Sequence, residues 1–149
     1  MKKIGAYTAR GRVANGIQKK LQLFDGRFDT AYKIVEFVVW GHDFSGSQTA
    51  DVLGRLMTKP NTNSSNAVFM DAADNTQIGW AGQSAAGGTW AAGEHILDPD
   101  NLIVEDLYLM CITANDTDDI NYMIKMEKYD ISDWQGALAL VRNSAQNDG

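Results

Sequence analysis

The pattern of apolar residues in the last third of the chain constrains the fold more than any other feature. From Leu102 to Thr113 nearly every residue is apolar on both alternating faces, which is typical of a strand buried on both sides. After a polar segment, apolar residues recur at every second position from Ile120 to Met126. That alternation predicts a strand with one buried face and one solvated face. We expect the two strands to form a hairpin around an Asn- and Asp-rich turn.

A short helix is predicted to follow these strands, over about residues 132–146. Ser132 and Gln135 have the spacing of a capping box, which satisfies the free N–H groups of a helix start. One apolar stripe then runs along the helix, formed by Trp134, Leu138, Val141 and Ala145. The stripe predicts packing against the sheet or against a neighbouring subunit.

The remaining strand signals predict an all-β protein. Residues 17–23 alternate and carry two lysines, which indicates a protected edge strand. Residues 32–40, YKIVEFVVW, indicate a well-buried strand, and residues 50–58 fit a short strand better than a helical turn. Short strands separated by Gly, Asn and Asp turns favour an antiparallel β-sandwich of seven or eight strands, jelly-roll-like, over βαβ units. We therefore expect one sandwich domain over residues 17–149.

Two segments lack a clear strand pattern. Residues 1–16 contain few apolar side chains and three glycines, so we expect an extended N-terminal arm that is ordered only by a partner. Residues 79–95 are rich in Gly and Ala around Trp80 and Trp90. This segment indicates either a connecting loop pinned by its tryptophans or a loop between subunits, because long loops are commonly functional.

Charge is distributed unevenly along the chain. Residues 1–33 carry eight basic and two acidic side chains, a net of +6, so residues 34–149 carry −12 of the total of −6. This distribution fits ordinary solvated surface, but it also fits steering of the basic segment onto the acidic body of another copy. An acidic body disfavours nucleic acid as a partner, except at the N-terminal segment. No run of residues is long and apolar enough for a membrane span.

No set of residues has the spacing of a catalytic or cofactor site. Cys111 lies in an apolar strand and is expected to be a small buried hydrophobe, and His42 and His95 have no recognisable catalytic partners. The acidic turn Asp116–Asp119 lacks the glycine and distal glutamate of a calcium loop, and its ion binding stays open. The glycines form neither a dinucleotide nor a phosphate loop. We expect a protein that is not an enzyme and has no cofactor.

The C-terminal end resembles small structural proteins of marine bacteriophages. In those proteins a strand of the form glutamate-x-aromatic-x-aliphatic-serine-aspartate leads into a helix. The matching residues here are Glu127, Tyr129, Ile131, Ser132, Asp133, Ala137, Val141, Arg142 and Asn143. The resemblance covers about the last fifty residues and implies a virion location and a capsid, decoration or spike protein with a jelly-roll-like sandwich.

We therefore expect a virion structural protein that assembles with itself and with other virion proteins. The alternative is a carbohydrate- or receptor-binding sandwich in which Trp40, Trp80 and Trp90 stack on sugar rings. In the first hypothesis, the basic arm of one copy contacts an acidic cluster of the next copy, and the Trp-bearing segment contributes. The residues expected in this contact are Lys2, Lys3, Ile4, Tyr7, Arg10, Arg12, Trp80, Trp90, Asp98, Asp100, Glu105 and Asp106.

Overall fold

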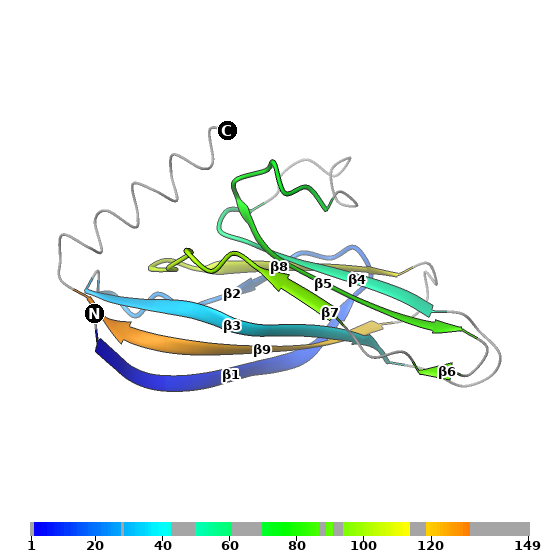
Figure 1. Ribbon diagram of the computed structural model, residues 1–149, viewed down its shortest axis with the longest axis horizontal. Helices are drawn as coiled ribbons and strands as arrows, with labels where there is room; N and C mark the ends of the chain where they lie inside the picture. The colour runs from blue at the N-terminus through cyan, green and yellow to red at the C-terminus, as the bar shows by residue number, and fades with distance from the viewer. Residues whose placement is uncertain are drawn as a thin grey trace.

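The protein is built from two antiparallel β-sheets that pack as a sandwich-like pair of layers (Figure 1). The computed structural model describes residues 2–27, 29–42, 50–60, 70–86, 89–90, 94–113 and 119–131. All regular elements in these ranges are strands. They are β1 (Lys2–Ala14), β2 (Lys19–Leu21), β3 (Thr30–Gly41), β4 (Ala50–Met57), β5 (Gln77–Ala86), β6 (Thr89–Trp90), β7 (Glu94–Leu97), β8 (Leu107–Thr113) and β9 (Asp119–Asp130).

The pairing of the strands is nested along the chain. One sheet has the order β1-β9-β3, and the other has the order β2-β8-β4-β5-β6, with β7 also paired to β5. The first strand therefore pairs with the last, β2 pairs with β8, and β4 pairs with β5. Between these, Tyr32 of β3 forms an antiparallel bridge with Ile103, just after β7. We call the sheets the β9 sheet and the β8 sheet after their inner strands.

The core lies between the two sheets. Its largest fully buried side chains come from both layers, including Phe37 and Ile124 of the β9 sheet and Leu56 and Leu109 of the β8 sheet. Burial of this apolar surface is the main favourable term in folding. A second, smaller cluster of Ala31, Val104 and Ile131 closes one end.

Most strand predictions are confirmed. In β9, the side chains at 120, 122, 124 and 126 are almost completely buried and those between them are more exposed. The segments predicted around residues 32–40 and 50–58 are β3 and β4. The predicted lysine-bearing edge strand is β2, which is shorter than expected but does end its sheet. The all-β prediction therefore holds for the described residues.

The predicted hairpin between the last two strands is wrong. β8 pairs with β2 and β4, whereas β9 pairs with β1 and β3 in the facing sheet. A polar segment between two strands marks a connection, but it does not say whether the strands become neighbours. Here the connection crosses from one layer to the other.

The N-terminal segment is also different from the prediction. Residues 2–14 do not form an arm that needs another molecule for order, because β1 pairs with β9 over its whole length. Backbone hydrogen bonds to a well-buried strand hold β1, and Val13 is its buried side chain. Its apolar content is low because most of its side chains are exposed.

The Gly- and Ala-rich segment forms strands and not the expected long loop. It contains most of β5, all of β6 and the start of β7. A Cβ atom added at Gly79 would lie 2.9 Å from a methyl carbon of Leu97 on the neighbouring strand. A side chain at position 79 would therefore have to displace the Leu97 side chain, which favours glycine there.

Two sequence predictions lie outside the described residues. They are the helix over about 132–146 and the turn residues 114–118. Within the described residues no helix is long and apolar enough to cross a membrane.

Candidate interaction surface

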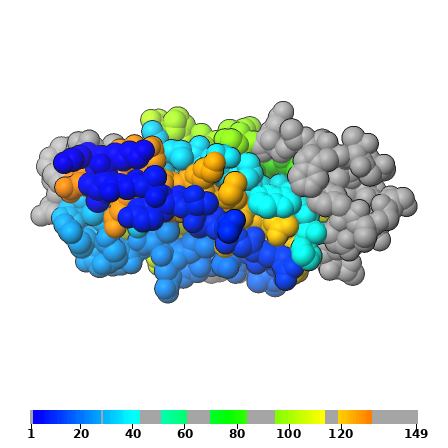
Figure 2. Space-filling model, turned by 90° about the horizontal axis from the view of Figure 1, so that it is seen from below, coloured from blue at the N-terminus to red at the C-terminus, as the bar shows by residue number. Residues whose placement is uncertain are grey.

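The outer edge of β1 is the most extended surface feature that a partner could use. β1 is thirteen residues long and ends its sheet, and within the described ranges no strand pairs with its outer edge. Figure 2 shows β1, in dark blue, running across one face of the molecule with no other coloured segment over it. An edge of this kind presents a row of unpaired backbone groups to solvent.

The register identifies which backbone groups of β1 face outward. Tyr32 exchanges both of its backbone hydrogen bonds with Ile103, at 2.8 Å each, so these groups point away from β9. Because groups alternate along antiparallel strands, the even-numbered residues of β9 must bond to β1. Their partners on β1 are the odd-numbered residues from Gly5 to Val13. The outward-facing N–H and C=O groups therefore belong to Ala6, Thr8, Arg10 and Arg12.

The side chains of β1 combine positive charge with exposed apolar surface. Ile4 and Tyr7 are 49% and 52% exposed, which is unusual for large apolar residues. The Tyr7 ring meets the Tyr32 ring edge to face, with centroids 6.2 Å apart. Lys2 and Arg10 are exposed and belong to no ion pair among the described residues.

Two basic residues of β1 instead hold the strand to β9. Lys3 Nζ lies 2.5 Å from Glu127 Oε2, and Arg12 Nε lies 3.2 Å from Asp119 Oδ2. The hydrogen bond between Lys3 and Glu127 raises the pKa of the lysine and lowers the pKa of the carboxyl. Arg12 also donates to Nε2 of His42, at 2.7 Å. His42 is thus a neighbour of β1, a contact that the sequence did not indicate.

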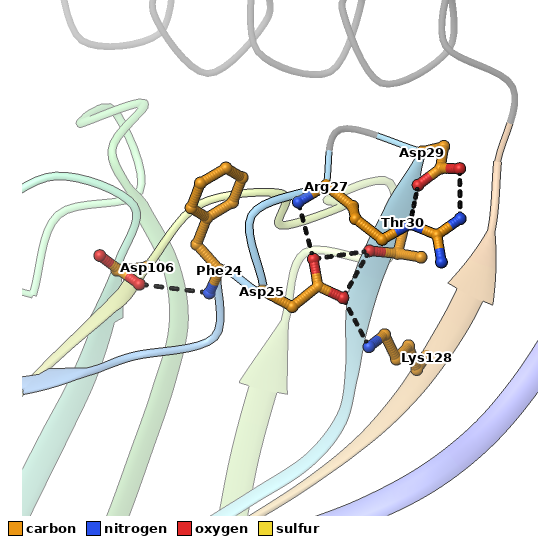
Figure 3. Close-up of polar contacts among 7 residues, drawn as sticks. All are labelled: Phe24, Asp25, Arg27, Asp29, Thr30, Asp106 and Lys128. Carbon is orange, nitrogen blue, oxygen red and sulfur yellow. Dashed lines mark hydrogen bonds and ion pairs between the residues drawn. The ribbon is translucent and has the colours of Figure 1, made fainter.

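A polar cluster beside this surface fixes the connection between the two sheets. Asp25 lies at its centre and accepts hydrogen bonds from the Lys128 ammonium at 2.9 Å, the Arg27 N–H at 3.0 Å and the Thr30 hydroxyl (Figure 3). The hydrogen bond from Lys128 is the largest cause that lowers the pKa of Asp25. Lys128 also lies 5.4 Å from the centre of the Tyr32 ring. Every side chain here is engaged, so the cluster is an anchor for the chain.

Asp106 has the same anchoring role at the other end of this connection. Its Oδ1 accepts the backbone N–H groups of Leu23 and Phe24, the latter visible in Figure 3, and its Oδ2 lies 3.1 Å from Lys20 Nζ. Burial opposes ionisation, but the hydrogen bond from Lys20 keeps the pKa of Asp106 below its ordinary value. This use of Asp106 within the chain argues against its expected role between subunits.

The other three acidic residues predicted for the contact between subunits do not share the anchoring role of Asp106. Asp98 Oδ1 accepts the backbone N–H of Asp100, which shapes the turn after β7. Asp100 and Glu105 are exposed, and Glu105 lies 3.9 Å from Lys59. These three carboxylates flank the Ile103 bridge at the outer edge of β3, on the side of the sandwich away from β1. Of the four acidic residues predicted for the contact, Asp106 therefore lies beside β2, whereas the other three belong to the segment that bridges to β3.

The tryptophans cannot form the single platform that a shared sugar site would need. Trp40 pairs with Asn121 and alternates with the buried Val39, so it lies on the outer face of the β9 sheet. Trp80 lies opposite Arg55 and next to the buried Ala81, so it lies on the outer face of the other sheet. Trp90 belongs to β6, and its side chain is outside the described part. Trp40 and Trp80 thus face opposite sides of the molecule.

Cys111 and the possible metal ligands are the residues whose chemistry the structure describes directly. Cys111 is fully buried, as predicted, and burial raises the pKa of its thiol to about 12. Within the described ranges no three His, Cys, Asp or Glu side chains come together in a way that could hold a metal ion. A thiol in this state is a packing group and not a nucleophile.

The sequence analysis did not predict one buried charged residue. Arg55 of β4 is 2% exposed, and its Nη2 donates to the sulfur of Met110 at 3.7 Å. Burial lowers its pKa, and the carboxylate of Asp74 acts in the opposite direction. The alternation of β4 could have located this residue, because Arg55 shares a face with Leu53 and Met57.

The fold and the surface define a class: a two-sheet antiparallel β-protein with a long, basic edge strand. No known protein-family profile matches the chain, and no curated protein matches it either. Function must therefore be argued from the surface itself.

Proposed function

We propose that this chain is a non-enzymatic structural protein of a virion that assembles through contacts between copies of itself. The observation that carries the proposal is the thirteen-residue edge strand β1, whose outer edge is open along the described chain. Exposed strand edges are templates for pairing with other chains, and soluble proteins normally shorten or cover them. An exposed edge strand of this length is therefore suited to pairing with another chain during assembly.

We further propose that the two sheets are the halves of a jelly roll. A jelly roll arises when a long antiparallel ladder folds over, so that its strands pair first with last and inward from there. The pairs β1 with β9, β2 with β8 and β4 with β5 support this, as does the bridge from Tyr32 to Ile103 in the third place. Jelly rolls occur in viral capsid proteins and in lectins, so the fold suits both functional hypotheses without deciding between them.

Two further features favour the virion hypothesis over the binding module. The resemblance of the chain end to phage structural proteins includes Glu127, Tyr129 and Ile131, which close β9 and the small cluster beside it. The alternative, a carbohydrate-binding sandwich, loses its shared platform because Trp40 and Trp80 lie on opposite outer faces. A binding site there would rest on one tryptophan, with Asn121 of β9 beside Trp40 as a polar neighbour.

The experiment that tests the proposal is the mass of the purified full-length chain in solution over a wide range of concentrations, followed by electron microscopy. We expect a discrete oligomer or a regular assembly that grows with concentration. A protein that stays monomeric at every concentration and binds sugars in a glycan screen would replace this proposal with the alternative.

A further inference from the structure

The two lateral sides of the sandwich are formed by different strands. β1 packs nearest to β8 of the facing sheet, whereas β3 packs against β4, β5 and β7. Because β2 lies beyond β8 and β7 lies beyond β5, the edges of β1 and β2 form one side. The edges of β3 and β7, with the segment after β7, form the opposite side (Figure 1).

These sides carry opposite charge. Residues 2–21, which contain β1 and β2, include six Lys or Arg side chains and no carboxylate. Residues 94–105, which begin with β7 and run past the bridge to β3, include four carboxylates and no Lys or Arg, whereas the next residue, Asp106, is bound to Lys20 of β2. We call residues 2–21 the basic side and residues 94–105 the acidic side. On the basic side, Lys3, Arg12 and Lys20 are paired with Glu127, Asp119 and Asp106, so its excess positive charge comes from Lys2, Arg10 and Lys19.

Each side also exposes large apolar residues. On the basic side these are Ile4 and Tyr7, together with Ile17, which is 60% exposed. On the acidic side Ile96 of β7 is 69% exposed, the highest exposure among the large apolar residues of the described chain. Apolar surface surrounded by charge is the usual composition of a contact between proteins, since the apolar part supplies affinity and the charges supply selection.

We propose that the basic side of one copy docks on the acidic side of a second copy of this chain. The inference rests on the proposed function, and it specifies the surface through which copies meet. Since the two sides are opposite and different, the contact is heterologous, and repeating it generates a ring or a filament. A two-fold contact of β1 with itself is disfavoured because it brings two basic sides together.

The decisive experiment uses two variants of the full-length chain, each with one side reversed. In the first, Lys2→Glu and Arg10→Glu reverse charges that belong to no ion pair among the described residues. In the second, Asp100→Lys and Glu105→Lys reverse exposed carboxylates. Lys125→Glu, on the outer face of the β9 sheet, is the control for charge reversal away from either side. Denaturation midpoints establish that every variant is folded.

The expected result is complementation between the variants. Each variant alone should associate at least about tenfold more weakly than the original chain, because reversed charges oppose encounter and docking. An equimolar mixture should associate again, starting with dimers, because the intact basic side of the second variant meets the intact acidic side of the first, and the two reversed sides also carry opposite charges. Sedimentation velocity measures both, and the Lys125→Glu control should assemble like the original chain.

Two outcomes would overturn the inference. If the original chain assembles, and either the variants assemble equally well or their mixture gains no dimer, then copies meet elsewhere and only the proposed function survives. If the original chain remains monomeric at every concentration and the mixture shows no dimer, both the inference and the proposed function are wrong.

Discussion

β1 and β9 are neighbouring strands of nearly equal length, yet different forces hold them in place. β9 lies between two strands and buries the side chains at 120, 122, 124 and 126 almost completely. β1 lies at the edge, exposes most of its side chains and buries Val13. β9 is therefore stabilised by apolar burial, and β1 by backbone hydrogen bonds to β9 and by ion pairs at Lys3 and Arg12. A strand can be as regular as its neighbour without sharing the neighbour's hydrophobic pattern.

The largest expected effect tests the β9 side of this comparison. Ile124 is fully buried, so Ile124→Thr removes a methyl group from the core and places a hydroxyl among apolar side chains. We expect the free energy of unfolding to fall by about 2–4 kcal/mol. Urea denaturation with an unchanged slope measures the loss. A change below about 1 kcal/mol would mean that burial does not hold β9.

A pair of proline substitutions tests the β1 side. The N–H of Ala9 is directed at β9, whereas the N–H of Thr8 is directed at solvent. Ala9→Pro should cost about 1–3 kcal/mol, because a backbone carbonyl of β9 loses its donor. Thr8→Pro should cost clearly less, since proline is tolerated where an edge N–H is free.

Thr8→Pro is the control for proline itself, because both substitutions restrict the backbone of the same strand. Urea denaturation of the two variants side by side gives the difference. A larger cost for Thr8→Pro than for Ala9→Pro would mean that the hydrogen bonds along β1 are shifted by one residue, and equal costs would mean that the bond of the Ala9 N–H does not stabilise β1.

The same contrast explains which parts of the fold could be predicted from the sequence. The sequence predicts strands at β9, β3 and β4, because the buried positions of these strands hold apolar residues in an alternating or continuous pattern. The sequence predicts an arm in place of β1, because β1 is ordered by hydrogen bonds to β9 and these leave no pattern in its own side chains. The composition of residues 79–95 predicts a loop, because glycine is typical of loops, whereas Gly79 and Gly82 lie in a strand where side chains of neighbouring strands leave little room for a Cβ atom.

The surface was predicted in part for a related reason. The charges of residues 2–12 and 98–105 are visible in the sequence, and the structure collects them on opposite sides of the sandwich. Asp106 binds Lys20 and two backbone N–H groups. These contacts could be predicted only if the path of the chain between the two sheets were known. Likewise, only the assignment of β3 and β5 to different sheets separates Trp40 from Trp80. Both results follow from which distant strands pair with one another, and local sequence composition does not determine that pairing.

A smaller effect is expected at the anchor beside β1 and β9. Asp25 accepts three kinds of donor, and its pKa is lowered from the ordinary value of 3.8, with the Lys128 hydrogen bond as the largest cause. A depressed folded-state pKa gives stability that is present above the unfolded value and is lost as the pH falls through the folded value. Asp25→Asn should cost about 1 kcal/mol at neutral pH.

The matching measurement is the pH dependence of unfolding between about pH 6 and pH 2. The original chain should lose stability below about pH 4, and Asp25→Asn should lose less over the same range, because the linked carboxyl is gone. A variant whose acid limb is as steep as that of the original chain would show that Asp25 does not contribute to it.

The smallest effect on stability is expected at Ile4, which carries on β1 the side chain that Ile124 carries on β9. Ile4 is 49% exposed, and threonine keeps the branched Cβ that suits a strand, so Ile4→Thr should change the free energy of unfolding by less than about 0.5 kcal/mol. Because one substitution is made on both strands, the ratio of the two costs measures how differently they are held. Urea denaturation of both variants gives that ratio, and a cost at Ile4 close to that at Ile124 would mean that Ile4 is covered in solution.

Such coverage would itself depend on protein concentration if a second copy supplied it, since binding to the folded state raises apparent stability by mass action. Repeating the denaturation of Ile4→Thr at two concentrations a hundredfold apart therefore separates a buried Ile4 within one copy from an Ile4 buried between copies.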